Sequence, residues 1–354
     1  RVEVEERADE WTRRLKTEVE GGMEDTKQGT ASEEAFDEDV LVTAAGQALE
    51  EADREHGGFG KGQKFPHPSR LDVLLRAHHR TGNASFLDVA EETLDAMAEG
   101  GLYDHVGGGF HRYCTDRVDG YRALGDERYA EVVDETVEFV DRELGHPDGG
   151  FYSTLDARSP EGEGGEHEEG AFYVWTPDEV HEAVDDDTAA GVFCDYYGVT
   201  EEGNFEGSNV LTVSERVDEI AEDRGMSEGS VEELLDEARD AVFEAREERP
   251  RPGRDEKVLA GWNGLMVSAL SRADFVLDAG YAERAEEALG FVRENLWDAD
   301  ERELRRRYKD GEAAVDGYLE DYAFLARGAL DLYQATQDLE HLGFALELCR
   351  AVVE

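Results

Sequence analysis

LDVLLRAHHRTGNASFLDVAEETLDAM, residues 71–97, contains two helical patterns with a turn between them. Apolar side chains recur at helical spacing on both sides of TGN at 81–83, and a glycine with an asparagine is typical of a helix end. Similar turns, each followed by another helical pattern, stand at LGD (124–126), AGY (279–281) and TQD (336–338). The sequence therefore predicts repeated helical hairpins, each of which must bury its apolar face on its neighbours.

The connections between these hairpins are long and rich in glycine and aromatic residues. Short strands are predicted at 148–153 and 170–175, on either side of an acidic glycine loop, and a third at 209–213. A capping box, TPDE at 176–179, predicts a short helix between them. Repeats stacked into an open solenoid keep short, uniform connections. Tight turns that alternate with long loops favour a closed ring of helical hairpins, an α/α toroid with the loops on one rim.

Two irregularities indicate that the ring is incomplete. Between Arg117 and Leu124 there is too little chain for a helix of the expected length. The last helical pattern runs to Glu354, so further hairpins are expected to be missing. We expect residues 1–35 to be a linker with the remnant of an upstream domain, and residues 36–354 to form a partial α/α toroid domain.

The charge of the chain is extreme. Of 354 residues, 88 are acidic and 36 basic, which gives a formal charge of −52, and only six of the basic residues are lysine. Hydrophobic residues make up 39% and recur at helical spacing, so the acid is expected on a folded surface. Self-repulsion of this size needs screening, which favours a cytoplasm of high salt, a halophilic setting. A nucleic-acid or anionic membrane partner is not expected.

Motifs for cofactors and metals are not evident. The three cysteines form no CxxC pair, which suggests reduced thiols. The lysines of GGFGKGQK at 57–64 lack the spacing and the hydroxyl residue of a phosphate-binding loop. His78-His79 lacks the HExxH pattern of a zinc site. We therefore expect no cofactor, no metal, no export signal and no membrane span.

The strongest candidate site is GGLYDHVGGGFHRYC, residues 100–114, which has five glycines in fifteen residues. Loops held by a rigid scaffold often carry function, and this one supplies Tyr103 and Asp104 as ligand contacts. His111 is the candidate acid/base, and Arg112 the cation that stabilises an enolate or holds a carboxylate. The alternative is a structural turn in which Arg112 pairs with Asp104 or Asp156 to brace the loops.

Further candidates lie later in the chain. Asp156 and Glu320 or Asp321 could act as the paired carboxylates of a glycosidase, although an exposed structural role is the commoner fate of an acidic residue. Aromatic rings stack on sugars, but at helix starts they more often belong to a core. The predicted stacking and hydrogen-bonding residues are Trp175, Trp262, Asn263, Tyr318 and Tyr322.

Seven motifs follow one another in a recognisable order: KFP (64–66), GGGFHRY (107–113), FYSTLDA (151–157), FYVWTPDE (172–179), YGVTEEGNFEG (197–207), DEKVLAGWNGLM (255–266) and DGYLEDYAF (316–324). With them the chain resembles the thioredoxin-domain-containing family typified by YyaL and spermatogenesis-associated protein 20. The resemblance implies an N-terminal thioredoxin-like domain followed by an (α/α)6 toroid of six hairpins. That toroid is similar to the N-acylglucosamine 2-epimerase and six-hairpin glycosidase folds.

The chain departs from that family at three places. The sequence contains no thioredoxin domain with a CxxC motif and no Pro-His-Phe-Glu-Lys-Met-Leu type helix after the glycine loop, and we expect the last hairpins to be missing. In addition, Arg158 stands where the family tends to have an acid. The resemblance implies a carbohydrate-active domain, an epimerase or isomerase or a hydrolase, that acts on a sugar-like ligand by acid/base chemistry. The alternative is a binding or scaffold module that partners a thioredoxin-like domain in redox or protein quality control. The sequence leaves open whether the chain is an enzyme.

Overall fold

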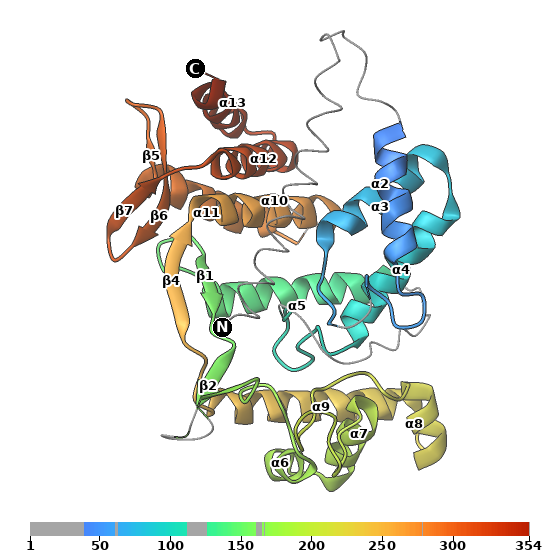
Figure 1. Ribbon diagram of the computed structural model, residues 1–354. Coiled ribbons are helices and arrows are strands. Elements are labelled where there is room, and N and C mark those ends of the chain that lie inside the picture. Colours follow the sequence, from blue (N-terminus) through green and yellow to red (C-terminus); the bar gives the residue numbers. More distant parts are fainter. Residues whose placement is uncertain are drawn as a thin grey trace, which may run out of the picture. The chain divides into compact units, whose positions relative to one another are not determined.

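The computed structural model describes residues 39–60, 63–111, 126–160, 165, 167–277 and 279–353 (Figure 1). Helices predominate, and the predicted all-α class, built from helical hairpins with short strands in the connections, is confirmed. None of the described helices is long and apolar enough to cross a bilayer. The predicted upstream remnant, Arg112 and the segment after Arg117 where a helix is predicted to be missing lie outside the described residues.

Contacts divide the chain into two compact units, residues 1–50 with 69–87 and residues 51–68 with 88–354. The first unit contains α2 (Asp39–Glu51) and α3 (Pro68–Thr81), and it passes into α4 (Ala84–Glu99). The predicted turn ends α3, because Gly82 has a φ of 70° and donates its N–H to the carbonyl of His78 at 2.7 Å.

The second unit contains an antiparallel sheet between its helices. After α5 (Asp126–Leu144), β1 (Tyr152–Leu155) pairs with β4 (Arg254–Leu259), and β4 pairs with β6 (Glu303–Lys309). β6 also pairs with β5 (Trp297–Asp298) and β7 (Glu312–Asp316). This sheet joins parts of the chain that lie more than one hundred residues apart, such as Tyr152 and Val258.

The strands predicted on either side of the acidic glycine loop are wrong in detail. The hairpin there is formed by β2 (Arg158–Pro160) and β3 (His167–Glu169). Residues 170–175 form a turn that starts at Gly170, whose φ is 78°, and they make a single β-bridge from Trp175 to Asn209. The predicted strands at 170–175 and 209–213 are therefore absent, because the left-handed glycine bends the chain away from the β2–β3 ladder.

A first apolar core is built around α9 (Glu228–Glu247). The predicted short helix, α6 (Pro177–Ala183), is present with its capping box, in which Thr176 and Glu179 exchange hydrogen bonds. The helices α7 (Asp187–Tyr197), α8 (Val217–Arg224) and α9 were not predicted, and they enclose Trp175 and Phe193.

A second core belongs to two helical hairpins, α10 (Ala260–Leu277) with α11 (Tyr281–Asn295) and α12 (Leu319–Thr336) with α13 (Leu339–Val353). Their turns are the predicted ones, with left-handed residues at Gly280 and Gln337. Figure 1 shows α10 and α12 side by side. They cross closely, because a Cβ on Gly328 would lie 2.4 Å from the carbonyl oxygen of Gly264.

Candidate functional site

The glycine loop after α4 is folded tightly on itself. The N–H of Asp104 donates to the carbonyl of Gly109 at 3.0 Å, and the N–H of Gly108 donates back to the carbonyl of Asp104 at 2.9 Å. Gly108 and Gly109 have positive φ, and a Cβ on either would clash with α5, at 2.4 Å from the carbonyl oxygen of Glu135 and 2.5 Å from the ring of Phe139. The glycines are therefore required for the loop to lie against α5.

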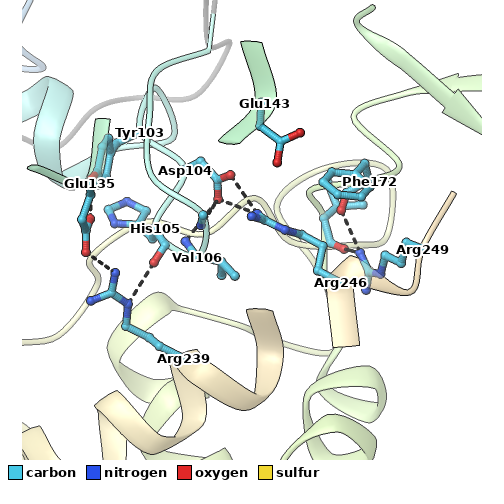
Figure 2. Close-up of polar contacts among 12 residues, drawn as sticks. Tyr103, Asp104, His105, Val106, Glu135, Glu143, Phe172, Arg239, Arg246 and Arg249 are labelled. Atoms are coloured by element: carbon cyan, nitrogen blue, oxygen red, sulfur yellow. Dashed lines mark hydrogen bonds and ion pairs between the residues drawn. The ribbon is translucent and has the colours of Figure 1, made fainter. Parts of the chain in front are cut away.

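A buried ion pair fixes the loop to α9. Nη1 of Arg246 donates to both carboxylate oxygens of Asp104, at 2.7 and 2.8 Å, and the two side chains are 3% and 8% exposed (Figure 2). Oδ1 of Asp104 also accepts the N–H groups of Val106 and Gly107 at 3.1 Å. Burial opposes ionisation, but Arg246 and these N–H groups hold the pKa of Asp104 below its usual range. Asp104 is therefore an anion that organises the loop.

Aromatic side chains surround the guanidinium of Arg246. Its Cζ atom lies 5.2 Å from the ring centre of Phe172 and 5.7 Å from that of Tyr173. Arg246 was not among the predicted site residues. A signal was present, because it continues the buried stripe of α9 through Val242 at a spacing of four residues. A charged residue on a buried stripe needs a partner, and here that partner is Asp104.

A second polar network holds the other side of the loop (Figure 2). The hydroxyl of Tyr103 donates to the carboxylate of Glu135, which also receives Nη2 of Arg239 at 2.6 Å. Nε of Arg239 donates to the carbonyl of His105 at 3.1 Å. Burial, with Glu135 adjacent, raises the pKa of Tyr103, so this phenol stays protonated and acts as a donor. Tyr103 therefore fastens the loop to α5.

A cavity of about 440 Å³ opens beside the Asp104–Arg246 pair. This volume lies in the range of small-molecule sites. Its wall includes the rings of Phe139, Phe172 and Tyr173. Its charged lining consists of four arginines, Arg142, Arg246, Arg251 and Arg254, and three carboxylates, Asp104, Glu143 and Glu256. The run RPRPGR at 249–254 was a sequence signal for part of this wall, although its arginines were not predicted as site residues.

His111 lies at the edge of this arrangement. Its ring packs edge-on against Tyr173, with 4.7 Å between the ring centres, and its side chain is partly exposed. Burial lowers the pKa of His111, an effect that Asp104 opposes and Arg246 reinforces. The imidazole is therefore neutral near pH 7 and can accept a proton. Of the predicted site residues, Asp104 lines the cavity, and Tyr103 and His111 belong to the same loop.

Two other predicted residues lie near this region in different surroundings. Asp156 is exposed, accepts the N–H of Arg158 at 3.1 Å and donates its own N–H to the carbonyl of Gly253 at 2.6 Å. Trp175 is 1% exposed within the α9 core, and the Arg249 guanidinium lies 3.8 Å from its ring centre. The catalytic role of Asp156 and ligand contact by Trp175 stay predictions.

The remaining predicted residues gather where α10 and α12 begin. Asp321 is buried and accepts hydrogen bonds from the N–H groups of Gly261 and Tyr318, at 3.2 and 2.9 Å. Arg306 pairs with both Asp321 and Glu320 at 2.8 Å, and its guanidinium lies over the ring of Tyr318. These contacts brace the helix starts, and Glu320 and Asp321 stay predictions as catalytic groups.

Three further side chains flank these helix starts. The side chain of Asn263 is buried and bonds the backbone N–H and carbonyl of Phe151, and the Tyr322 hydroxyl accepts the N–H of Leu304 at 2.8 Å. Trp262 is 49% exposed. Between described residues, no hydrogen bond or ring contact joins this cluster to Asp104 or His111. In the part of the chain that the structure describes, no group of three or more His, Cys, Asp or Glu could hold a metal ion.

Comparisons with known proteins place the chain among sequence relatives. It is 36% identical to human spermatogenesis-associated protein 20 over 355 residues, which cover 85% of this chain and 45% of that protein. An uncharacterized protein of Caenorhabditis elegans is 28% identical over 88% of this chain and 49% of its own length. The chain thus spans about half the length of the curated relatives that it matches. No family model matches it.

Solved structures show weaker similarity. A sugar epimerase from a ruminal bacterium aligns with a TM-score of 0.35 and 13% identity, over 88% of this chain and 84% of that one. A D-mannose isomerase aligns with a TM-score of 0.34 and 12% identity, over 91% and 87%. Scores below 0.5 are too low to support a functional comparison.

Proposed function

The chain is a homologue of spermatogenesis-associated protein 20 over 85% of its length, and we propose that it binds a small, sugar-like ligand in the cavity beside Asp104 and Arg246. The observation that carries the proposal is the combination, in one cavity of about 440 Å³, of aromatic rings with seven charged side chains. Rings offer apolar faces to a sugar ring, and charged groups can hydrogen-bond its hydroxyls.

We propose that His111 is the acid/base group of this site. Its lowered pKa keeps the imidazole unprotonated near pH 7, the state in which it can take a proton from a carbon next to a carbonyl. Tyr173, which lines the cavity, is in contact with its ring. Arg246, one of the four arginines that line the cavity, would stabilise the negative charge developing on the substrate. The reaction would be an isomerisation or epimerisation.

Hydrolysis has less support than proton transfer. A glycosidase needs two carboxylates on opposite sides of one bond. Asp156 is exposed and accepts a backbone N–H, and Glu320 and Asp321 are paired with Arg306 at the start of α12. The alternative of a binding or scaffold module has one observation in its favour: all three of these predicted carboxylates serve the local structure. A thioredoxin-like domain as its partner stays part of that alternative.

Deuterium exchange tests the proposal. The full chain would be incubated in D₂O with a panel of aldoses and ketoses, and incorporation at the carbon next to the carbonyl followed by proton NMR. His111→Ala should reduce the rate by about 10²- to 10⁴-fold, the usual contribution of a general base. His181→Ala is the matched control, because this partly exposed histidine lies on α6 outside the cavity lining and should leave the rate unchanged.

The outcomes separate the two proposed functions. Unchanged exchange in a stably folded His111→Ala protein would remove the catalytic assignment. Thermal unfolding with the same sugars tests binding alone, since a ligand at 100 times its Kd adds about 2.7 kcal/mol of stability. A thermal shift without exchange would favour the binding module. Neither a shift nor exchange with any sugar would reject a sugar-like ligand.

A further inference from the structure

We infer that the ligand of the cavity carries a negatively charged group, a carboxylate or a phosphate, held by the arginines of α5, α9 and the segment that leads into β4. This inference rests on the proposed function and names the ligand class of the same site. It is carried by the charge of the cavity wall, by the way its arginines are paired, and by a buried nitrogen without a partner.

The cavity wall has the opposite charge balance from the rest of the chain. Four arginines and three carboxylates line it, whereas the whole chain has 36 basic and 88 acidic residues. Acidic surface elsewhere repels an anion, so a site with an excess of guanidinium groups is where an anionic ligand would be tolerated. Guanidinium groups also match carboxylate and phosphate in geometry, because their N–H groups lie in one plane and bond two oxygens together.

One carboxylate in the wall serves several arginines. The two oxygens of Glu143 receive Nε of Arg142 at 3.0 Å and Nη1 of Arg251 at 2.5 Å. The backbone carbonyl of the same residue accepts Nη1 of Arg254 at 3.1 Å. Nη2 of Arg251 also donates to Glu247, and Nη2 of Arg254 donates to Glu256 at 3.2 Å. A guanidinium has five N–H donors, so each of these two arginines still has donors beyond its two bonds for a ligand. Their side chains are 42% and 35% exposed at the cavity, which makes them accessible to solutes.

The buried arginine supplies the second observation. Both bonds from Arg246 to Asp104 use Nη1, and Nε of Arg246, although buried, has no hydrogen-bond partner among the described residues. A buried donor without an acceptor costs about 1 to 3 kcal/mol, so such groups usually have a function or a missing partner. Arg246 lines the cavity, so an anionic ligand there would place a second negative group beside a guanidinium whose Nε has no acceptor in the described part of the chain.

Isothermal titration calorimetry on the full chain tests the inference by comparing its affinity for neutral sugars with that for their charged counterparts. The pairs are D-glucose with D-glucuronate, D-galactose with D-galacturonate, and D-mannose with D-mannose 6-phosphate, at the lowest KCl concentration at which the chain stays folded. At least one charged member should bind about tenfold or more tightly than its neutral parent, a difference of about 1.4 kcal/mol. The uronates and the phosphate distinguish a carboxylate site from a phosphate site.

Variants of the cavity wall test whether its arginines cause the preference for a charged sugar. Arg251→Gln and Arg254→Gln, tested separately, should each lower affinity for the charged sugar about fivefold or more and leave that for the neutral sugar within twofold. Arg305→Gln is the matched control: its side chain is similarly exposed and ion-paired with Glu303 and Asp316, but it does not line the cavity. Thermal unfolding of each variant confirms that it is folded, and Arg251→Lys should restore part of the affinity.

The results distinguish this inference from the proposed function. Equal affinity for charged and neutral sugars would overturn the anionic ligand and leave sugar binding intact. A preference for the charged sugar that survives both glutamine variants, or that falls equally in Arg305→Gln, would also overturn it, since the cavity arginines would not be responsible. No binding of any pair would reject both.

Discussion

At the scale of single residues, Asp104 shows how burial increases the stability that depends on an ion pair. Its carboxylate accepts two backbone N–H groups and both bonds from Arg246, so the loop and α9 depend on the same anion. Removing one partner of such a pair is strongly destabilising, because the other charge stays buried and unpaired. By contrast, the exposed pair of Arg216 and Asp218 should contribute little.

His105 gives a pH prediction on the same loop. Burial lowers its pKa from 6.5 to about 4, and its Nε2 atom has no hydrogen-bond partner among the described residues. Between pH 6.5 and pH 4 the unfolded chain therefore binds a proton that the folded chain does not. Stability contributed by the neutral ring is present above pH 6.5 and is lost as the pH falls towards 4, by about 3 kcal/mol.

The measurement compares urea unfolding of the wild-type chain and His105→Phe from pH 7.5 to pH 4. The variant keeps a flat ring beside Tyr103 and Tyr197, with which His105 is in contact, but it does not titrate. As the pH falls, the free energy of unfolding of the wild-type chain should decrease relative to that of His105→Phe. Acidic residues elsewhere titrate in both proteins, so their contributions to the unfolding free energy cancel in the comparison. Parallel pH profiles would contradict a buried neutral histidine.

At the scale of elements, the crossing of α10 and α12 depends on two glycines. A Cβ on Gly328 would lie 2.4 Å from the carbonyl oxygen of Gly264, and a Cβ on Gly264 would lie 2.5 Å from the backbone nitrogen of Leu325. Any side chain there must push the helices apart. We expect Gly328→Ala to lower the free energy of unfolding by about 1 to 3 kcal/mol, although alanine is the better helix former.

Gly343 is the matched control for this prediction. It lies in α13, and a Cβ there would have no heavy atom within 4 Å. Gly343→Ala should therefore stabilise the chain by about 0.5 to 1 kcal/mol, through the lower entropy of its unfolded state. Urea unfolding of both variants at one KCl concentration measures the two effects. A loss of stability in both, or in neither, would mean that close helix contact is not what selects glycine at Gly328.

At the scale of the whole molecule, net charge sets the conditions for folding. A formal charge of −52 on 354 residues gives strong self-repulsion in the folded state. Raising the salt from 0.1 to 1 M shortens the screening length from about 10 to about 3 Å. We expect the Tm to rise by about 10 °C or more over this range of KCl concentration. Thermal unfolding monitored by circular dichroism measures this change.

Sucrose separates screening from solvent exclusion, because it favours burial without screening charge. At matched osmolality it should raise the Tm by much less than KCl does. A Tm that is flat between 0.1 and 2 M KCl, or equal shifts in sucrose and KCl, would contradict the screening explanation and with it the expectation of a high-salt setting.

The sequence determined what depends on local order. Helical spacing and turn residues predicted the end of α3 at Gly82 and the hairpins at Gly280 and Gln337, and the capping box predicted the start of α6. The ordered motifs also indicated the family, and the glycine loop marked a place where charged side chains are buried together. These features are readable because each acts through residues within a few positions of one another.

Only the tertiary structure decided which distant side chains meet. Asp104 and Arg246 are 142 positions apart, and no local pattern joins them. The partner of β1 is β4, about one hundred residues on, and no local pattern in the sequence predicted this pairing. Glu320 and Asp321 were candidate catalytic acids in the sequence, and only the structure shows that Arg306 pairs with both at a helix start. The reason is physical: a contact between distant residues follows from packing of whole elements, which spacing along the chain does not encode.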